Sequence, residues 1–447
     1  MSGIKYVILG IAVIMYALVI AFQNKKVIFT TAAALLVILL GTFMPGVVFP
    51  LPQNISSGSA YFYAFMHSFF EVINWNVIMI YLGSMIIAAL FLYSNVPARI
   101  ADNIINSSKN PGIAIILILA MTAVISIFVE NVATVLVMAP IALSLCKKLK
   151  MNPTYFMIGL AVMSNLEGTA TLVGDPPSMI FAAYANYNFN DFFLHNGTIS
   201  IFFIIQAGLL AGCIYFYFFF TKYSKQKIEV EKTQVISYVP FVILLIMILG
   251  LAAVSFIPTD FPYISGLFVF ALGLLSLVWF AVCQKKSKKE VWTLVKELDW
   301  ETIFFLLGIF IVVGAIQEAG LLEDFAMFLA GICGGSKVLG FLIIILVSIL
   351  ISGFVDNVPY IIAMLPVAGS LALAMNINKE LYMFALLIGS CLGGNLTPFG
   401  ASANVVSMGI VKKEGYPMKF SLWLKVAVPF TIITTGIAAI VLWLLWA

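Results

Sequence analysis

Charged residues are scarce in this sequence: 9% of its 447 residues are Asp, Glu, Lys or Arg, while 63% are hydrophobic. A soluble domain carries charge on roughly a quarter of its residues, so the composition excludes an ordinary soluble protein. The five cysteines show no CxxC spacing, so neither a disulfide framework nor a zinc site is expected. The sequence contains no GxxxxGK[ST] motif, and direct use of ATP by this chain is not expected.

Apolar runs of about 20 residues recur along the whole chain, and each is long enough to cross a bilayer as a helix. Eight of them read as simple spanning helices: 4–22, 28–49, 76–94, 198–221, 237–257, 264–283, 301–320 and 420–446. No small-residue cleavage site follows the first run, which favours a membrane helix over a signal peptide. The sequence therefore predicts an all-α polytopic membrane protein.

Two further apolar regions, 110–187 and 338–411, are interrupted by Asn, Gly, Pro and acidic residues, which an ordinary spanning helix avoids. A shift of 226 residues aligns 130–178 with 356–404 without a gap, and 15 of the 49 aligned pairs are identical. Upstream, the residues from 74 to 76 align with those from 299 to 301 at a shift of 225. The chain is therefore predicted to contain two copies of one unit.

Each copy is predicted to contain a re-entrant helical hairpin followed by a helix that is broken in the middle. An acidic residue precedes an asparagine at each hairpin tip, and an odd number of spans separates the copies, so the second copy is expected to be inverted. The expected fold has about ten spanning helices plus two re-entrant hairpins, in two inverted-topology repeats with broken helices. The expected domains are an N-terminal membrane helix (1–27), a first repeat (28–221, hairpin 110–148, broken helix 154–187), a linker with an additional membrane helix (222–263) and a second repeat (264–447, hairpin 338–376, broken helix 381–411).

The distribution of basic residues agrees with this topology. With ten spans and two hairpins, 20 of the 23 Lys and Arg residues fall on one side, and Lys5, Lys337 and Lys379 fall on the other. Both termini are therefore predicted to lie outside the cytoplasmic membrane of a prokaryote. The segments 95–109 and 284–299 have mixed polar and apolar faces and are expected to form interfacial helices or arms.

Four of the nineteen acidic residues lie inside the predicted hairpins and broken helices: Glu130, Glu167, Asp175 and Asp356. A charged group at membrane depth costs about 2.5 to 3.5 kcal/mol, so each of the four is a candidate functional residue. No Lys or Arg is predicted at the same depth. A bound cation or a proton is therefore expected to compensate these charges, with Glu130, Glu167 and Asp356 as candidates for proton coupling.

The helix breaks provide further candidate ligands. Their glycines are expected to permit backbone conformations that other residues resist, and Pro176 and Pro177 are expected to restart a helix. Unwound carbonyls and half-helix ends can bind small ions. Two alternatives stay open here: Asp175 can cap the following helix or bind the ion directly, and Glu167 can be a proton site or a solvated loop residue.

The paired segments SNLEGTATLVGDPPSMI and GGNLTPFGASANVV, preceded by the hairpin sequences VENVATVLVMAP and VDNVPYIIAMLP, resemble the ion transporter superfamily. The resemblance is to its ArsB/NhaD and P-type permease branch, a distant relative of the divalent anion/sodium symporters, and it covers roughly residues 28–446. It implies a secondary transporter with two inverted repeats. It also implies a homodimer in the lipid bilayer that moves a transport domain against a scaffold in an elevator-like cycle.

The resemblance also indicates site residues. Asn131 and Asn357 match hairpin-tip asparagines, where a bound sodium ion is expected. The residues that match the two helix breaks, or add polar groups to them, are Thr171, Gly174, Asp175, Asn395, Thr397, Gly400, Ser402 and Asn404. Carboxylate-carrying relatives have Ser-Asn-Thr at the hairpin tips, whereas this chain has Glu-Asn-Val and Asp-Asn-Val.

The leading hypothesis is a secondary active transporter of a small inorganic ion, coupled to protons or sodium. Sodium suits an acidic site without lysine, while arsenite, which is neutral as its hydroxide, suits hydroxyl and amide ligands. A sodium-coupled di- or tricarboxylate transporter, a passive channel and an intramembrane aspartyl protease are alternatives, although the protease does not account for the duplication. No enzymatic activity, no nucleic-acid partner and no cofactor other than sodium is expected.

Overall fold

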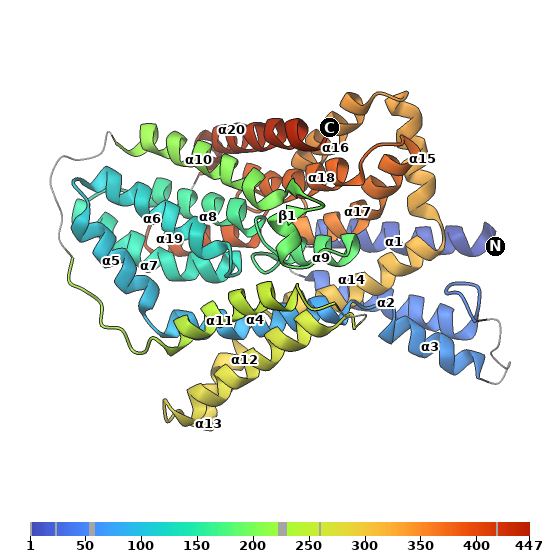
Figure 1. Cartoon of the computed structure of the whole chain (residues 1–447), viewed down its shortest axis with the longest axis horizontal. Helices are drawn as coiled ribbons and strands as arrows, with labels where there is room; N and C mark the ends of the chain where they lie inside the picture. Colours follow the sequence, from blue (N-terminus) through green and yellow to red (C-terminus); the bar gives the residue numbers. More distant parts are fainter. Residues whose placement is uncertain (1, 23–24, 53–58, 222–229, 259–260, 417–418) are drawn as a thin grey trace.

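The structure is a computed structural model that describes residues 2–22, 25–52, 59–221, 230–258, 261–416 and 419–447. Within these residues nearly every element is a helix (Figure 1), which confirms the all-α fold class. Nine of the described helices are long and apolar enough to cross a membrane, and three shorter apolar helices accompany them. Each of the eight simple spans expected from the sequence forms a helix.

The helices follow the same order twice. The first ten are α1 (Ser2–Ala21), α2 (Lys26–Phe43), α3 (Ala60–Phe70), α4 (Trp75–Tyr93), α5 (Val96–Ser107), α6 (Pro111–Ser126), α7 (Asn131–Leu149), α8 (Thr154–Gly168), α9 (Pro176–Ala185) and α10 (Ile201–Phe220). Their counterparts are α11 (Val239–Val254), α12 (Ile264–Val282), α13 (Lys288–Lys296), α14 (Trp300–Glu318), α15 (Leu321–Cys333), α16 (Lys337–Ser352), α17 (Asn357–Ala374), α18 (Lys379–Gly393), α19 (Ser402–Lys413) and α20 (Phe420–Trp446). The predicted domain boundaries stay a prediction, and this order favours adding α1 and α11 to the two repeats. Part of the predicted linker, 222–229, lies outside the described residues.

The fourth helix of each copy begins in the same way. Asn74 Oδ1 accepts a hydrogen bond from the Val77 N–H at 3.0 Å, and Asp299 Oδ1 accepts one from the Thr302 N–H at 3.0 Å. A side-chain acceptor at this position stabilises a helix start by about 1 kcal/mol. The aligned segments before α4 and α14 therefore have the same local role.

The two helical hairpins, α6 with α7 and α16 with α17, are held to the following broken helices by equivalent hydrogen bonds. Ser126 Oγ lies 3.0 Å from the Ser164 carbonyl oxygen, and Ser352 Oγ lies 2.5 Å from the Ser390 carbonyl oxygen. Adding 226 to the residue numbers of the first pair gives the residue numbers of the second pair. The hairpins are thus built alike, and their re-entry into the membrane stays a prediction.

The breaks between α8 and α9 and between α18 and α19 are also built alike. Thr171 Oγ1 donates to the Ile127 carbonyl oxygen, and Thr397 Oγ1 donates to the Gly353 carbonyl oxygen. In each copy this bond ties the break to the end of the first hairpin helix. A short 3-10 helix, η3 (Gly394–Leu396), forms part of the second break.

The glycines in the breaks are required for close approach of the backbone. Neither Gly174 nor Gly400 has a positive φ angle. A Cβ on Gly174 would lie 2.6 Å from the Gly168 carbonyl oxygen, and one on Gly400 would lie 2.6 Å from the Gly394 carbonyl oxygen. The prediction that these glycines provide unusual backbone conformations is therefore wrong for both positions. Glycine is required there because any side chain would collide with a neighbouring backbone carbonyl group.

The helices form two groups that are joined by α5 and α15. The first group contains α1 to α4 and α11 to α14, and the second contains α6 to α10 and α16 to α20. In the first group α12 packs along α4 and α2 packs along α14, so the two copies interlock. Most of the first group lies in the lower part of Figure 1 and most of the second group lies above it.

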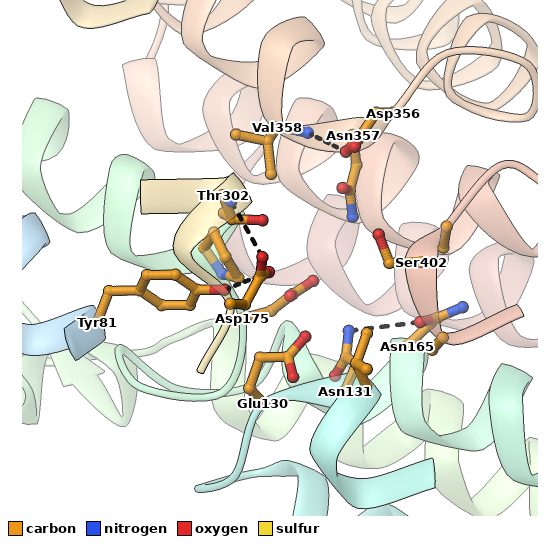
Figure 2. A pocket seen from close by; sticks show the side chains of 15 residues that line it. Tyr81, Glu130, Asn131, Asn165, Asp175, Thr302, Asp356, Asn357, Val358 and Ser402 are labelled. Carbon is orange, nitrogen blue, oxygen red and sulfur yellow. Dashed lines mark hydrogen bonds between the residues drawn. The ribbon is translucent and has the colours of Figure 1, made fainter. Parts of the chain in front are cut away.

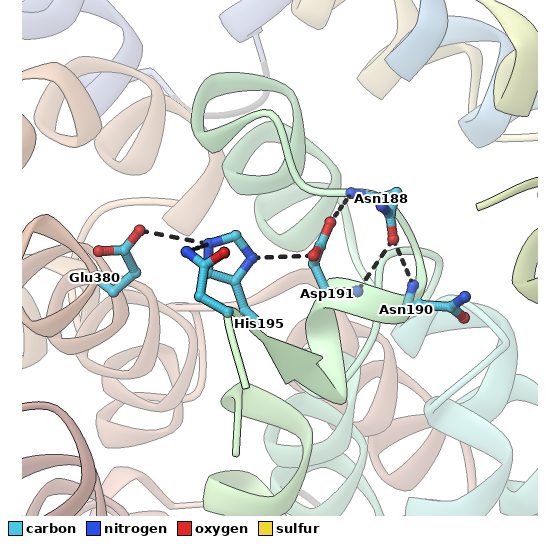
Figure 3. A network of polar contacts seen from close by, with 6 residues as sticks. Asn188, Asn190, Asp191, His195 and Glu380 are labelled. Atoms are coloured by element: carbon cyan, nitrogen blue, oxygen red, sulfur yellow. Dashed lines mark hydrogen bonds and ion pairs between the residues drawn. The ribbon is translucent and has the colours of Figure 1, made fainter. Parts of the chain in front are cut away.

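Several elements were not anticipated from the sequence. These are α3, α15 and a hairpin of two short strands, β1 (Leu194–His195) and β2 (Thr198–Ile199), next to the 3-10 helix η2 (Asn190–Phe192). His195 on β1 connects the two copies (Figure 3): its Nδ1 lies 3.0 Å from Asp191, and its Nε2 lies 3.7 Å from Glu380 at the start of α18. The expected arms at 95–109 and 284–299 contain the helices α5 and α13.

Candidate functional site

The two hairpin tips and the two helix breaks meet around one small cavity (Figure 2). The cavity has a volume of about 30 Å³, which suits about two water-sized species. Its lining comes from the tips, the breaks and the starts of α4 and α14: Tyr81, Glu130, Asn131, Val132, Asn165, Asp175, Pro176, Asp299, Thr302, Asp356, Asn357, Val358, Ala401, Ser402 and Ala403. Six residues predicted from the sequence are therefore brought together here, namely Glu130, Asn131, Asp175, Asp356, Asn357 and Ser402.

The first hairpin tip places a carboxylate and an amide at the cavity. Glu130 precedes α7, and its Oε2 accepts a hydrogen bond from the Ala133 N–H at 3.0 Å. Asn131 Oδ1 accepts from Ser126 Oγ at 2.7 Å, and Asn131 Nδ2 donates to Asn165 Oδ1 at 3.4 Å. The tip is thus anchored by local bonds while the Glu130 carboxylate remains part of the cavity wall.

Asp175 lies between the two tips. It precedes α9, yet its side chain makes no capping hydrogen bond, so the structure gives no support to the alternative that it serves as a helix cap. The side chain is buried, and its carboxylate interacts with the amides of Asn131 and Asn357 and with the charges of Glu130 and Asp356. Asp175 is therefore the acidic group that links the first copy's site to the second.

The second hairpin tip carries an ion pair. Asp356 Oδ1 accepts a hydrogen bond from the Val358 N–H at 3.2 Å, and Asp356 Oδ2 lies 2.9 Å from Lys26 Nζ. Lys26 is the first residue of α2 and was assigned to a connection on sequence grounds. The prediction that no lysine lies at the depth of the acidic residues is therefore wrong for Asp356, because the packing of α2 along α14 brings Lys26 to the tip.

Three residues at the cavity come from the first helix group and were not proposed as site residues. Tyr81 on α4 donates its hydroxyl to Asp299 Oδ2 at 3.1 Å, and Asp299 also accepts from the Thr302 N–H. The alignment of the two copies pointed to Asp299 as the start of a span, but nothing in the local sequence distinguishes Tyr81 or Thr302. The cavity thus lies between the two helix groups.

Asn165 near the end of α8 joins the two breaks. Its Nδ2 donates to Asn395 Oδ1 at 2.8 Å and to Asn404 Oδ1 at 2.9 Å. Asn404 Nδ2 in turn donates to the carbonyl oxygens of Gly394 and Thr397, each at 2.9 Å. Asn395 and Asn404 therefore lie behind the cavity, where they hold the breaks together, and they do not line it.

The other predicted residues also lie off the small cavity. Thr171, Thr397 and Gly174 support the backbone of the breaks, and Gly400 lines a neighbouring space. Glu167 is buried within α8, and its Oε2 accepts a hydrogen bond from Gln206 Nε2 at 2.7 Å. The alternative that Glu167 is a solvated loop residue is therefore wrong. Within the described residues, no three His, Cys, Asp or Glu side chains form a metal site.

Two larger spaces lie next to the helix starts of the first group. We call the first the charged vestibule: it has a volume of about 320 Å³, and the charged groups in its wall are Lys26, Asp299, Glu301 and Asp356. We call the second the amide vestibule: it has a volume of about 480 Å³ and a wall that includes Asn74, Asn76, Asn186, Asn188 and Ser265. The charged vestibule shares Val132, Asp299, Thr302, Asp356, Ala401 and Ser402 with the small cavity, whereas the amide vestibule shares none of its lining residues with the cavity.

Comparisons with known proteins agree on the kind of molecule. The family model described as citrate transporter (CitMHS) matches residues 11–389 and 327–447. An uncharacterized transporter of Mycobacterium tuberculosis is 31% identical over 376 residues, which cover 83% of this chain and 86% of that protein. The P protein of Sus scrofa is 23% identical over 442 residues, which cover 81% of this chain and 52% of that protein.

Two solved transporter structures have a similar fold. The YdaH transporter of Alcanivorax borkumensis gives a TM-score of 0.61 at 14% sequence identity, with 93% of this chain and 97% of that chain covered. MtrF of Neisseria gonorrhoeae gives a TM-score of 0.55 at 14% identity, with 92% and 94% covered. At this level of identity the likeness concerns the fold alone.

Proposed function

This chain belongs to the citrate transporter family, and we propose that it is a secondary active transporter of a small inorganic ion, coupled to protons or sodium. Family membership confirms the resemblance drawn from the hairpin and break motifs, and the P protein match agrees with the P-type permease branch. It also establishes an integral membrane protein whose role is transport of a small ion or solute. The identity of the ion and its coupling are the parts that we propose.

The observation that carries the proposal is the charge of the cavity. Glu130, Asp175, Asp299 and Asp356 line it, and Lys26 beside Asp356 is the one basic side chain among the described residues of the cavity and charged vestibule. Asp175 is buried and the other three are half-buried, and such an excess of carboxylates away from bulk water is stable only when cations or protons compensate it. A volume of about 30 Å³ fits a small ion better than it fits a multi-carbon anion.

The proposed cation site is formed by the first tip and the first break. Glu130 and Asp175 provide carboxylate oxygens, and the amide oxygen of Asn131 lies beside them. Oxygen ligands of this kind suit sodium. Glu130 is the proposed group for proton exchange, because Asp356, the other tip carboxylate, already pairs with Lys26. Asn357 of the second tip and Ser402 of the second break also line the cavity, and they are the proposed contacts for a neutral hydroxide such as arsenite.

The two helix groups support a transport cycle in which one moves against the other. The cavity lies at their boundary, because Tyr81, Asp299 and Thr302 belong to the first group and the tips and breaks belong to the second. Under the predicted topology, with both termini outside, the charged vestibule faces the cytoplasm. The described arrangement is then open inwards, and an elevator-like movement within a homodimer would carry the cavity towards the other side.

Transport of a di- or tricarboxylate is the second candidate. The name of the family favours it, and so does the charged vestibule, whose volume of about 320 Å³ is large enough for a larger anion beside Lys26. The acidic wall of that vestibule, with Asp299, Glu301 and Asp356, opposes it. A flux experiment separates the two candidates.

The test is ion flux in proteoliposomes that contain an internal pH dye, with imposed gradients of sodium, lithium, arsenite or citrate. Uphill movement of one of the inorganic ions, linked to a proton or sodium gradient, is the expected result. Glu130→Gln should lower this coupled flux by about 100-fold, because removal of one partner from a buried charge site costs about 3 kcal/mol. Glu297→Gln, an exposed position directly after the last residue of α13, is the control and should transport like the wild type. Uphill citrate movement, or undiminished coupled flux in Glu130→Gln, would contradict the proposal.

A further inference from the structure

Lys26 and Asp356 form a half-buried ion pair at the second hairpin tip. The distance from Nζ to Oδ2 is 2.9 Å, and the two side chains are only 13% and 21% exposed. The ammonium also lies 5.3 Å from the centre of the Phe305 ring, so an aromatic face covers one side of it. The pair is therefore largely shielded from water; Asp356 lines both the cavity and the charged vestibule, and Lys26 lines the charged vestibule.

The duplication of the chain identifies the residue that stands in the place of Lys26 in the other copy. Gly83 of α4 packs closely on Val269 of α12, and its counterpart Gly308 of α14 packs closely on Thr30 of α2. Thr30 and Val269 are therefore equivalent, and the residue four positions before Val269 is Ser265. A neutral serine takes the place of the lysine, and it lies in the amide vestibule.

The first tip accordingly has a carboxylate without an ammonium partner. Glu130 accepts a hydrogen bond from the Ala133 N–H and lies near the acidic Asp175, and no basic side chain among the described residues lines the cavity. Glu130 is half-buried, and a carboxylate that is partly shielded from water and lacks a partner is unfavourable, whereas one paired with an ammonium is tolerated. The first tip therefore requires a cation or a proton from solution, whereas the second tip already has the Lys26 ammonium.

We propose that the Lys26 ammonium is a built-in cation that neutralises the second tip, so that exchangeable cations bind only at the first tip, at Glu130 and Asp175. This inference rests on the proposed function, since it assigns the coupling cation of that function to one of two duplicated positions. In chains whose second tip has no such lysine, both tips would require an ion. The ammonium thus sets the number of coupling cations per chain.

The inference is tested by equilibrium binding of radioactive sodium to the purified full chain. Wild type should bind about one sodium ion, and Lys26→Met should bind about two, because Asp356 then needs a cation from solution. The double variant Lys26→Met with Asp356→Asn lacks both partners and should return to about one ion. Lys26→Arg keeps the positive charge and should bind like the wild type, which separates the charge from a general effect of substitution at this position.

The outcomes separate the inference from the proposed function. The wild-type value tests whether sodium is the coupling cation at all, and the difference between Lys26→Met and wild type tests the role of Lys26. A Lys26→Met protein that binds the same number of ions as the wild type overturns the inference, as does a wild type that binds about two. If Lys26→Met does not fold, the role of Lys26 is tested instead by comparing sodium binding of the double variant with that of Asp356→Asn alone. The unpaired ammonium of the single variant should then weaken sodium binding relative to the double variant.

Discussion

The two copies of the repeat share their hydrogen-bonded scaffold but differ in their charges. The bonds from Ser126 and Ser352, and those from Thr171 and Thr397, join equivalent atoms in each copy. The charged vestibule, by contrast, has Asp299 and Glu301 where the amide vestibule has asparagines. The scaffold sets the shape of both breaks, and the side chains around it decide the charge of each vestibule, where Glu71 is the acidic group of the amide vestibule.

The difference extends to the connection with the small cavity. The charged vestibule shares part of its wall with the cavity, while the amide vestibule shares no lining residue with it. Two copies with the same hydrogen-bonded scaffold can therefore differ in whether their vestibule adjoins the cavity. Pairs of equivalent substitutions test this distinction: changes in the scaffold should act alike in both copies, and changes in charge should not.

The largest effect is expected at the Lys26–Asp356 pair. Asp356→Asn leaves the ammonium buried without its partner, which should repel the coupling cation and lower coupled flux by about 100-fold. Adding Lys26→Met to Asp356→Asn should raise the coupled flux again by about tenfold, because the uncompensated ammonium charge disappears. Initial rates of flux in proteoliposomes measure both values.

The matched control for this prediction is Glu130→Gln combined with Lys26→Met. Glu130 is not the partner of Lys26, so the second substitution should give no recovery there. Equal recovery in both backgrounds would mean that the two tips do not differ in the way that the ion pair indicates.

The next effect concerns the glycines of the breaks. Gly174→Ala and Gly400→Ala each place a Cβ 2.6 Å from a backbone carbonyl oxygen, and each should destabilise the protein by about 1 to 3 kcal/mol. Gly409→Ala, where nothing lies within 4 Å of the added Cβ, is the control and should be neutral or slightly stabilising. The midpoint of thermal unfolding in detergent measures all three. A large loss in one break and none in the other would show that the breaks are not equivalent.

A smaller and nearly equal effect is expected from the hairpin serines. Ser126→Ala and Ser352→Ala each remove a buried hydrogen bond to the following broken helix, at a cost of about 1 kcal/mol. Ser126→Ala should also loosen Asn131, whose amide oxygen lies 2.7 Å from the Ser126 hydroxyl. Thermal unfolding should thus show similar shifts, with a loss of cation affinity only for Ser126→Ala.

The smallest effect is expected at His195, which lies outside the duplicated scaffold. Its imidazole contacts Asp191 on its own connection and Glu380 on the other copy, and the side chain is 17% exposed. His195→Asn should lower stability by about 0.5 to 1 kcal/mol, as partly exposed ion pairs contribute little. Coupled flux that falls to the level of the Asp356 variant would contradict the view that this network is structural.

Much of the fold could be predicted because it depends on local patterns. Apolar runs of spanning length gave the helices, and the shift of 226 residues gave the pairing of Asn131 with Asn357 and of Thr171 with Thr397. Helix α5 was expected from the sequence, but its counterpart α15 was not. The apolar segment of α15 is short and follows α14 almost directly, so it does not stand out as a separate helix. The role of the break glycines was also misjudged, because the nearness of another backbone cannot be inferred from composition.

The candidate site was predicted in outline but not in its charge balance. Glu130, Asp175 and Asp356 stand out in the sequence because acidic residues are rare in apolar segments. Asn395 and Asn404 were expected at the site and instead hold the breaks together, since amides serve either purpose and only the contacts distinguish them.

The sequence by itself determined that this is a duplicated helical membrane protein with acidic hairpin tips, since hydropathy and repetition are properties of neighbouring or aligned residues. Only the tertiary structure decided which charges meet. Lys26 and Asp356 are 330 positions apart, and their contact depends on how α2 packs along α14. Coulombic pairing acts through distance in space, and that distance is set by helix packing rather than by the order of residues along the chain.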